Sequence, residues 1–279
     1  MSHVSNIDRR ERLSCPQDCD SRRLVLKPPP VRLHFLIVGC GLGGLAAAYC
    51  LGRAGHSVSV FESATRLQQV GAGIQISPNS SRLLIRWGLG EELRKASVKP
   101  ESITFRRYNS GERIGYTRWG DTMDSNYGAP YYHIHRADLL DMLFKLAAPH
   151  MTLFTNSRVV AVDPAQGQIT LQSGETVRGD VVLGADGLKS MVREVIVGRP
   201  DKPLPTGDAA YRVVIPTARM MADPDLASLV EYPEMTGWLG PGRHIMAYCI
   251  VRRLRACPEW LSLIHFSFRS APSGSSILF

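Results

Sequence analysis

Three glycines and one acid have the types and spacing of a dinucleotide-binding site. Gly39, Gly41 and Gly44 form the pattern G-x-G-x-x-G directly after the apolar run 35–38. The first glycine permits a tight exit from a strand, the second lets a pyrophosphate approach the backbone, and the third lets the next helix pack on the sheet. Glu62 lies 18 residues after Gly44, near the roughly 20 expected of a carboxylate that binds a ribose diol. The pattern predicts a nucleotide pyrophosphate bound at a helix N-terminus.

A second acid follows a later apolar run. Asp186 stands in Gly184-Ala185-Asp186-Gly187, after Val181 to Leu183 and before a helix that contains Ser190 and Arg193. This position predicts an acid at the carboxyl edge of the sheet, where open α/β sheets bind ligands. The alternative is an aspartate that only caps a tight turn.

Three more polar residues are candidates for ligand contact. Arg136 is expected just before an amphipathic helix that carries Leu139, Leu140, Leu143 and Leu146, where its guanidinium reaches a phosphate or a ring edge. Arg212, in 209–215, and Tyr248, in 238–250, lie in segments that read as strands carrying polar residues into a cleft. A core tyrosine with a salt-bridged arginine is the alternative for the second pair.

The elements that position these residues follow from periodicity and turn residues. Strands are expected at 35–38, 57–61, 152–162, 168–171 and 176–184, a helix at 80–87, and an antiparallel excursion at 103–119. Gly71 and Gly73 flank an alanine, which indicates either backbone packed closely on another surface or a plain glycine-rich turn. His133 and His135 alternate with Ile134 as strand residues do, so structural histidines are favoured over a metal site.

Composition excludes several classes of protein. The chain has 279 residues and a net charge of +8, but residues 1–34 and 250–279 supply +6 of it, and the body has no basic stripe interleaved with aromatics. Nucleic-acid binding is therefore not indicated. The uncharged run 35–52 contains five glycines, which favours strand, turn and helix over a membrane span. Residues 1–31 lack the apolar core of a secretory signal and are expected to be a disordered leader.

The six cysteines form no C-x-x-C pair. Cys40 and Cys50 lie in the nucleotide-binding unit, where small buried apolar side chains are expected, and Cys15 and Cys19 have no matching pair for zinc. This usage fits a reducing compartment, and a cytoplasmic location is expected.

Taken together, these motifs resemble the group A flavoprotein aromatic hydroxylases, and more closely the salicylate-hydroxylase-like FAD monooxygenases of fungi. The resemblance covers about residues 33–249. Gly39 to Gly44 with Glu62 look like the ADP-binding unit for FAD, 71–79 is similar to the signature beside the flavin, Arg136 matches the arginine that contacts FAD, and 184–187 resembles the motif implicated in FAD and NAD(P)H binding.

The resemblance implies a fold and an activity. It implies an α/β chain with a Rossmann-like FAD-binding domain of the p-hydroxybenzoate-hydroxylase type at 32–200, an excursion at 100–130, and part of an inserted mixed or antiparallel substrate sheet at 201–250. NAD(P)H would reduce FAD, and one oxygen atom of O2 would pass to a small phenolic substrate, as in secondary metabolism. Arg212 would hold an anionic group, and Tyr248 would bind or polarise the phenol.

The chain also departs from the family pattern. Family members continue well over a hundred residues beyond the strand of Tyr248 and include a Gly-Asp segment that grips the cofactor, whereas Gly207-Asp208 here precedes the Tyr-Arg strand. We therefore expect a C-terminally truncated chain with a divergent tail at 251–279. The alternatives are an inactive fragment with weak or no flavin binding, and a flavin oxidase or dehydrogenase that does not use Arg212 and Tyr248.

Overall fold

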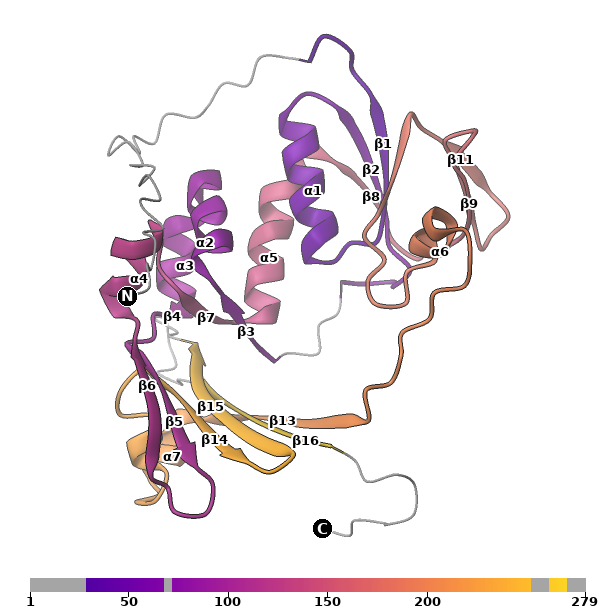
Figure 1. Cartoon of the computed structure of the whole chain (residues 1–279). Helices are drawn as coiled ribbons and strands as arrows, with labels where there is room; N and C mark the ends of the chain where they lie inside the picture. The colour runs from indigo at the N-terminus through magenta and orange to yellow at the C-terminus, as the bar shows by residue number, and fades with distance from the viewer. Residues whose placement is uncertain (1–28, 68–71, 252–260, 270–279) are drawn as a thin grey trace, which may run out of the picture.

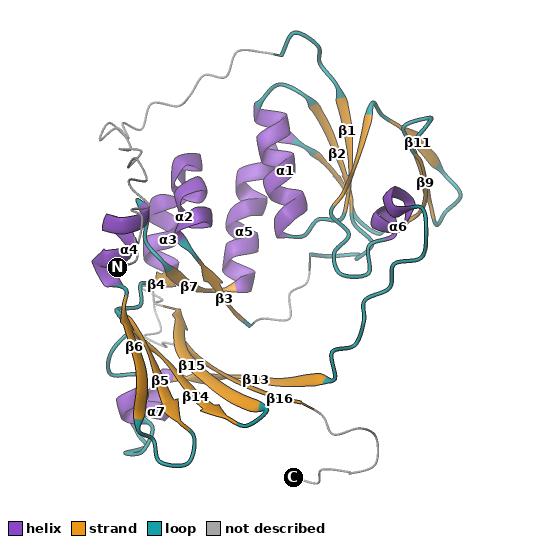
Figure 2. Cartoon of the chain, in the orientation of Figure 1, coloured by secondary structure: helices purple, strands orange, loops and turns teal. Residues whose placement is uncertain are grey.

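The computed structural model describes residues 29–67, 72–251 and 261–269, the last of these as backbone only. The strands in these ranges form four sheets, and Figures 1 and 2 show α1 (Leu42–Arg53) and α5 (Arg136–Ala147) beside the upper sheet, with the largest sheet and α7 (Thr217–Met221) lying below them. Most of the predicted leader, together with Cys15, Cys19, Gly71 and Cys257, lies outside the described residues.

The N-terminal half of the fold is built on a parallel sheet. Its strands are β1 (His34–Val38), β2 (Ser57–Phe61), β8 (Thr152–Phe154) and β12 (Val181–Gly184), in the order β12-β1-β2-β8. Ile37 packs among α1 (Leu42–Arg53) and α5 (Arg136–Ala147), whereas Leu36 and Val38 pack on the opposite side. A strand buried on both faces reads as a continuous apolar run, which is why the sequence identified β1.

The opposite face of this sheet is covered by a small antiparallel sheet and a helix. The elements are β9 (Val159–Asp163), β10 (Gln168–Leu171), β11 (Thr176–Arg178) and α6 (Met191–Val197). Ile169, Leu171 and Val192 pack against Leu36 and Val38.

Two predicted strands were wrong because each is divided between two sheets. The predicted strand 152–162 breaks between β8 and β9, where Asn156 takes a left-handed φ of 52°. The predicted strand 176–184 breaks between β11 and β12, where a Cβ on Gly179 would lie 2.7 Å from Leu36 Cγ, and where the Asp180 carboxylate accepts a hydrogen bond of 2.7 Å from the His34 backbone nitrogen. Contacts with β1 therefore cause the break between β11 and β12. Such tertiary contacts leave no sign in the local periodicity of the sequence.

A third sheet carries the glycine segment beside the histidines. It contains β3 (Gly73–Ile76), β7 (Tyr132–His135) and β4 (Ser97–Val98), all antiparallel. The predicted helix 80–87 begins earlier, as α2 (Pro78–Leu84), and continues through the π-helical turn η1 (Ile85–Leu89) into α3 (Gly90–Ala96). The helical path bends at Gly88, which has a φ of 99°. After α5, the 3₁₀ turn η2 (Ala148–His150) leads to β8.

The largest sheet has six strands and is mixed. The strands are β5 (Ser102–Arg107), β6 (Arg113–Arg118), β13 (Asp208–Pro216), β14 (Glu234–Gly240), β15 (Arg243–Val251) and β16 (Leu261–Arg269), in the order β13-β16-β15-β14-β5-β6. Only the pair β14 and β5 is parallel. Shorter elements connect the strands: α4 (Gly120–Tyr127), α7 (Thr217–Met221) and η3 (Ala227–Leu229).

This sheet confirms one prediction and corrects two. The antiparallel excursion at 103–119 is the hairpin of β5 and β6, and it lies in the same sheet as β13 to β16. The segment 238–250 is not one strand but parts of two, because Gly242 with a φ of 65° closes a hairpin between β14 and β15. The tail at 251–279, which was expected to be divergent, contains β16, which pairs with β13 and β15.

Two expectations about side chains and membranes can be compared with the described residues. Cys40 is buried as expected, but Cys50 is exposed, so the prediction of two buried cysteines was wrong for the second. None of the described helices has the length and apolar character needed to cross a membrane.

Candidate functional site

Glycine has a different structural role at each of the three glycine positions of the G-x-G-x-x-G loop. Gly39 has a φ of 102°, and a Cβ there would lie 2.4 Å from the Ala185 carbonyl oxygen. A Cβ on Gly44 would lie 2.0 Å from the Gly39 carbonyl oxygen. A Cβ on Gly41 would meet no atom within 4 Å, and Gly41 is the N-cap of α1. Packing therefore requires Gly39 and Gly44, whereas Gly41 keeps open space in front of a helix N-terminus.

Glu62 closes one side of this loop. Its Oε2 accepts a hydrogen bond of 2.9 Å from the Cys40 backbone nitrogen, and its Oε1 accepts from the Ala64 nitrogen at 2.8 Å and from Ser63 Oγ at 3.1 Å. Burial raises the pKa of this carboxyl, but the hydrogen bonds from Ala64, Cys40 and Ser63 outweigh it and hold the pKa below its usual value. An ionised carboxylate thus lies directly beside the N-terminus of α1.

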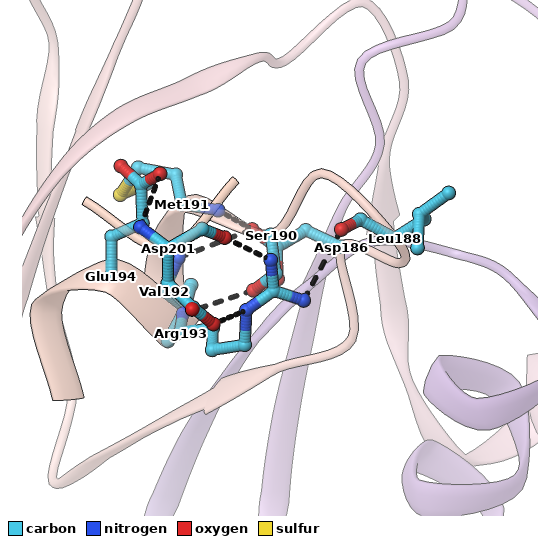
Figure 3. A network of polar contacts seen from close by, with 8 residues as sticks. All are labelled: Asp186, Leu188, Ser190, Met191, Val192, Arg193, Glu194 and Asp201. Atoms are coloured by element: carbon cyan, nitrogen blue, oxygen red, sulfur yellow. Dashed lines mark hydrogen bonds and ion pairs between the residues drawn. The ribbon is translucent and has the colours of Figure 1, made fainter. Parts of the chain in front are cut away.

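Asp186 organises the second loop at the edge of the sheet. Figure 3 shows its carboxylate accepting hydrogen bonds from Ser190 Oγ at 2.6 Å and from the backbone nitrogens of Met191 at 2.7 Å and Val192 at 3.2 Å. The capping role that the sequence left open is therefore present: Asp186 caps α6. Gly39 lies against the Ala185–Asp186 backbone, so the two loops touch.

Arg193 forms further hydrogen bonds within the same loop, 186–201. Its guanidinium donates to the carbonyl oxygens of Leu188 and Asp201, and Asp201 Oδ2 lies 2.7 Å from Nε as an ion-pair contact outside hydrogen-bond geometry (Figure 3). Ser190 Oγ accepts from the Arg193 backbone nitrogen at 2.9 Å. In this structure Ser190 and Arg193 thus hold the shape of the loop 186–201.

A cavity of about 360 Å³ lies where these elements meet, at the carboxyl ends of β1, β2 and β12, and we call it the nucleotide cavity. Gly39, Gly41, Glu62 and Asp186 line it, and Gly44 packs behind Gly39. Sequence reasoning missed the lining cations Arg158 and Lys189. Each is a single charged residue in a loop, so no spacing signal could have found it.

Gly73 and Arg136 lie together at the third sheet. Gly73 pairs with His135 in the register of β3 and β7, and the Arg136 backbone nitrogen donates a hydrogen bond of 2.9 Å to the Ala72 carbonyl oxygen. Arg136 is the first residue of α5 rather than the residue before it, a difference of one position. Its side chain is exposed.

Arg212 and Tyr248 lie on the same face of the six-stranded sheet. The register aligns Val214 with Leu263 and Leu263 with Tyr248, and Val214 and Tyr248 pack in one cluster. Because side chains alternate along a strand, Arg212 shares the face of Val214. One strand, β16, separates β13 from β15, so the two backbones are roughly 10 Å apart. Tyr211 lies on the other face and is 61% exposed.

Tyr248 is buried in a group of polar and aromatic side chains that sequence reasoning did not connect. Only 7% of it is exposed, and burial raises its pKa, while a hydrogen bond with the Gln75 side chain and the charge of Arg212 act in the opposite direction. The rings of His133 and Tyr248 are 4.6 Å apart, and those of Trp119 and Tyr131 are 4.5 Å apart. These residues come from four strands or their flanks, so only tertiary structure could bring them together.

His133 is a structural histidine, as predicted. It is 1% exposed, its ring bonds to the backbone of Cys249, and its Nε2 has no hydrogen-bond partner among the described residues. Burial lowers its pKa to about 3. The described part of the chain contains no cluster of side chains that could hold a metal ion.

A second cavity, of about 730 Å³, has none of the predicted site residues in its lining. It is lined by Lys99, Asp124 and Tyr132, among others, near α3 and α4. Lys99 Nζ is 2.6 Å from both Asp121 and Asp124, so its charge is already paired. This cavity is larger than the nucleotide cavity, but it is not the better candidate for a nucleotide site, because no loop of the nucleotide-binding pattern lines it.

Comparison with known proteins decides the family. The model of the family described as "FAD binding domain" matches residues 32–226, which is more than half of the chain. The chain belongs to this family. Its relatives include the FAD-dependent monooxygenase OpS4 of Beauveria bassiana (strain ARSEF 2860), 38% identical over 225 residues, which cover 78% of this chain and 52% of the relative. Another is the 3-amino-4-hydroxybenzoate 2-monooxygenase PtnB3 of Streptomyces platensis, 36% identical over 85% of this chain and 56% of the relative.

The fold is shared with solved flavoproteins. The crystal structure of CtdE in complex with FAD and substrate 4 matches with a TM-score of 0.75 and 21% identity, covering 87% of this chain and 58% of that one. The predicted fold class, a Rossmann-like FAD-binding domain with an inserted mixed sheet, is confirmed. The chain spans about half the length of the curated relatives it matches.

The residues of the nucleotide cavity fit the ADP half of FAD. The open space at Gly41 allows a pyrophosphate to approach the N-terminus of α1, as the pattern requires. The ionised Glu62 lies beside it, and Arg158 and Lys189 add positive charge to the lining. The predicted cofactor, FAD, is thus consistent with both the family and the local chemistry.

Proposed function

We propose that this chain provides the FAD-binding site and one wall of the substrate site of an aromatic monooxygenase. The reaction would convert a small phenol, O2, NAD(P)H and one proton to the hydroxylated phenol, water and NAD(P)+. The relatives' printed names, which include a hydroxylase of 3-amino-4-hydroxybenzoate, support a hydroxybenzoate-like substrate. The fungal and Streptomyces relatives support a role in secondary metabolism.

The observation that carries this proposal is the shared face of Arg212 and Tyr248. A protein that only bound a dinucleotide would have no need for a cation and a buried phenol on one face of a separate sheet. Here Gln75, which lies two residues beyond Gly73, bonds to Tyr248 and so connects that face to the predicted flavin segment. Binding of an anionic aromatic ring is the chemistry that these side chains support.

Each candidate residue has a defined task in the proposal. The backbone at Gly39, Gly41 and Gly44 admits the pyrophosphate, and Glu62 accepts hydrogen bonds from the ribose diol. Asp186 holds the adjoining loop in shape, so it acts on the cofactor through its backbone. Gly73 and Arg136 border the cofactor further along, Arg136 as the cation.

The substrate side depends on two residues. Arg212 pairs with the anionic group of the substrate, and Tyr248 makes a hydrogen bond with the phenolic oxygen, which holds the ring in one orientation. Bound FAD would supply hydride acceptance from NAD(P)H and the activation of O2. The apolar cluster of Met235, Tyr248 and Ile250 keeps water from the adjacent part of the sheet.

The test is turnover by the 279-residue chain loaded with FAD. NAD(P)H oxidation and hydroxylated product would be measured with 3-hydroxybenzoate and 3-amino-4-hydroxybenzoate. We expect Arg212→Gln to raise KM strongly and Tyr248→Phe to lower kcat/KM by about tenfold, the loss of a hydrogen bond to a charged group. Tyr211→Phe, on the opposite face of β13, is the matched control and should behave as wild type. Unchanged turnover in both site variants would refute the assignment and favour a flavin oxidase or dehydrogenase.

A further inference from the structure

Gln75 occupies a position where its amide can take only one orientation. Tyr131 Oη lies 2.6 Å from Gln75 Oε1, and Gln75 Nε2 lies 3.6 Å from the sulfur of Met235. A thioether sulfur can accept a hydrogen bond but cannot donate one. The amide nitrogen must therefore face Met235, since a carbonyl oxygen there would meet a second acceptor.

This orientation determines which neighbours donate a hydrogen bond to Gln75 and which accept one from it. With Nε2 at Met235, Oε1 faces Tyr131, and the Tyr131 hydroxyl has to donate. The pKa of Tyr131 is raised by burial and by the neighbouring Tyr248 to about 12, so the hydroxyl retains its proton at neutral pH. The Gln75 side chain is also hydrogen-bonded to Tyr248, and we assign this bond to the second N–H of the amide because Oε1 already accepts from Tyr131. Tyr248 Oη then accepts from Gln75, which leaves its own proton for another partner.

We infer that Tyr131, Gln75 and Met235 form a directional hydrogen-bond chain that makes Tyr248 a donor toward the Arg212 face of the six-stranded sheet. A site with a donating phenol and a guanidinium on one face recognises an oxyanion, and here the ligand oxygen is a deprotonated phenol. The identity of that ligand rests on the proposed function, whereas the direction of the chain does not. Tyr131 and Gln75 are positioning residues, because they act through Tyr248.

The surroundings of Tyr248 support this direction. The direction follows from the contacts of Gln75 with Tyr131 and Met235, and a donor bonded to Tyr248 Oη stabilises the tyrosinate, as does the nearby charge of Arg212. His133, whose ring lies 4.6 Å from that of Tyr248, is neutral at physiological pH and adds no charge. Tyr131 is the other titratable neighbour. If Gln75 accepted a proton from Tyr248 instead, the bond would stabilise the neutral phenol and raise its pKa.

The test therefore measures the sign of a pKa change. The full chain would be labelled with 3-fluorotyrosine, whose ring fluorine lowers the phenol pKa and reports the ionisation of each tyrosine by ¹⁹F NMR. The Tyr248 signal would be assigned by its loss in Tyr248→Phe. We expect Gln75→Leu and Tyr131→Phe to raise the pKa of Tyr248, the first because the donor is removed and the second because the amide is no longer oriented. Gln75→Glu should raise it most, since a carboxylate only accepts and repels the tyrosinate.

The control is Tyr132→Phe, which removes the hydroxyl of the next tyrosine along the chain. Tyr132 is buried in the cluster that contains Leu84 and Leu93, and neither of the hydrogen bonds of Gln75 with Tyr131 and Met235 involves it. It should leave the Tyr248 pKa unchanged. A lowered or unchanged pKa in Gln75→Leu would overturn the proposal, because it would show that Gln75 accepts from Tyr248 or does not bond to it.

Ligand binding separates this proposal from the proposed function. Wild-type affinity for 4-hydroxybenzoate should increase about tenfold as ring fluorines lower its phenol pKa below the working pH, with benzoate as the ligand that lacks the phenol. In Tyr131→Phe this increase in affinity on fluorination should be about fivefold smaller than in wild type. Failure of wild type to bind any of these ligands would count against the proposed function, while the sign of the ¹⁹F pKa change would still decide the direction of the chain.

Discussion

The buried His133 makes stability strongly dependent on pH. Its folded pKa of about 3 lies below the usual value near 6.5, so the unfolded chain takes up a proton first as the pH falls. The contribution is fully present above 6.5 and is lost as the pH falls toward 3. Between pH 7 and pH 5 the linkage amounts to about 2 kcal/mol of unfolding free energy.

The assay is urea unfolding followed by tryptophan fluorescence at pH 7, 6 and 5, in wild type and in His133→Leu. The variant leaves the Cys249 backbone bond without its partner and is expected to be less stable at every pH, by roughly 1–3 kcal/mol. Its stability should nevertheless fall less steeply, because it cannot take up this proton. The difference between the two proteins cancels every other titration that they share. Parallel pH dependences would refute the account of a neutral, buried His133.

Other predictions concern the nucleotide cavity. Gly44→Ala places a Cβ 2.0 Å from a carbonyl oxygen and should lower stability by roughly 1–3 kcal/mol by thermal or urea unfolding. Gly41→Val meets no atom within 4 Å of its Cβ and should cost no more than about 1 kcal/mol of stability as an N-cap change, yet lose ADP binding in calorimetry because it fills the approach path. Glu62→Gln should weaken ADP binding about tenfold, and unchanged affinity would contradict its role at the ribose. Asp186→Ala should cost about 1 kcal/mol of stability, since it removes the acceptor of the Met191 and Val192 backbone nitrogens at the start of α6, and an unaltered melting temperature would contradict this role.

The sequence predicted features that depend on local patterns. The apolar run at 35–38 and the alternation at 57–61 predicted β1 and β2 correctly. A strand that is buried on one or both faces needs apolar residues at the buried positions, so its sequence shows the pattern directly. The contacts of Gly39 and Gly44 with backbone explain why the fingerprint contains glycine at those positions. Glu62 lies beside the loop because parallel strands end at the same edge of the sheet.

The features that the sequence did not predict depend on distant partners. The break at Gly179 exists because Leu36, more than a hundred residues earlier, fills the space beside it. Gln75 and Tyr131 are separated by 56 positions, and their bond has no local signature. The same holds for β16. It forms a strand by pairing with β13 and β15, and the pattern of its own residues did not predict it.

The most direct test of the account is whether this chain holds FAD. The purified 279-residue chain would be incubated with FAD and desalted, and its visible spectrum would be recorded beside that of Gly41→Val treated in the same way. We expect flavin absorption to be retained by wild type and lost by the variant, with both proteins folded at the assay temperature. A colourless wild type, or equal flavin in both, would contradict the central claim that the cavity at Gly41 and Glu62 binds the cofactor.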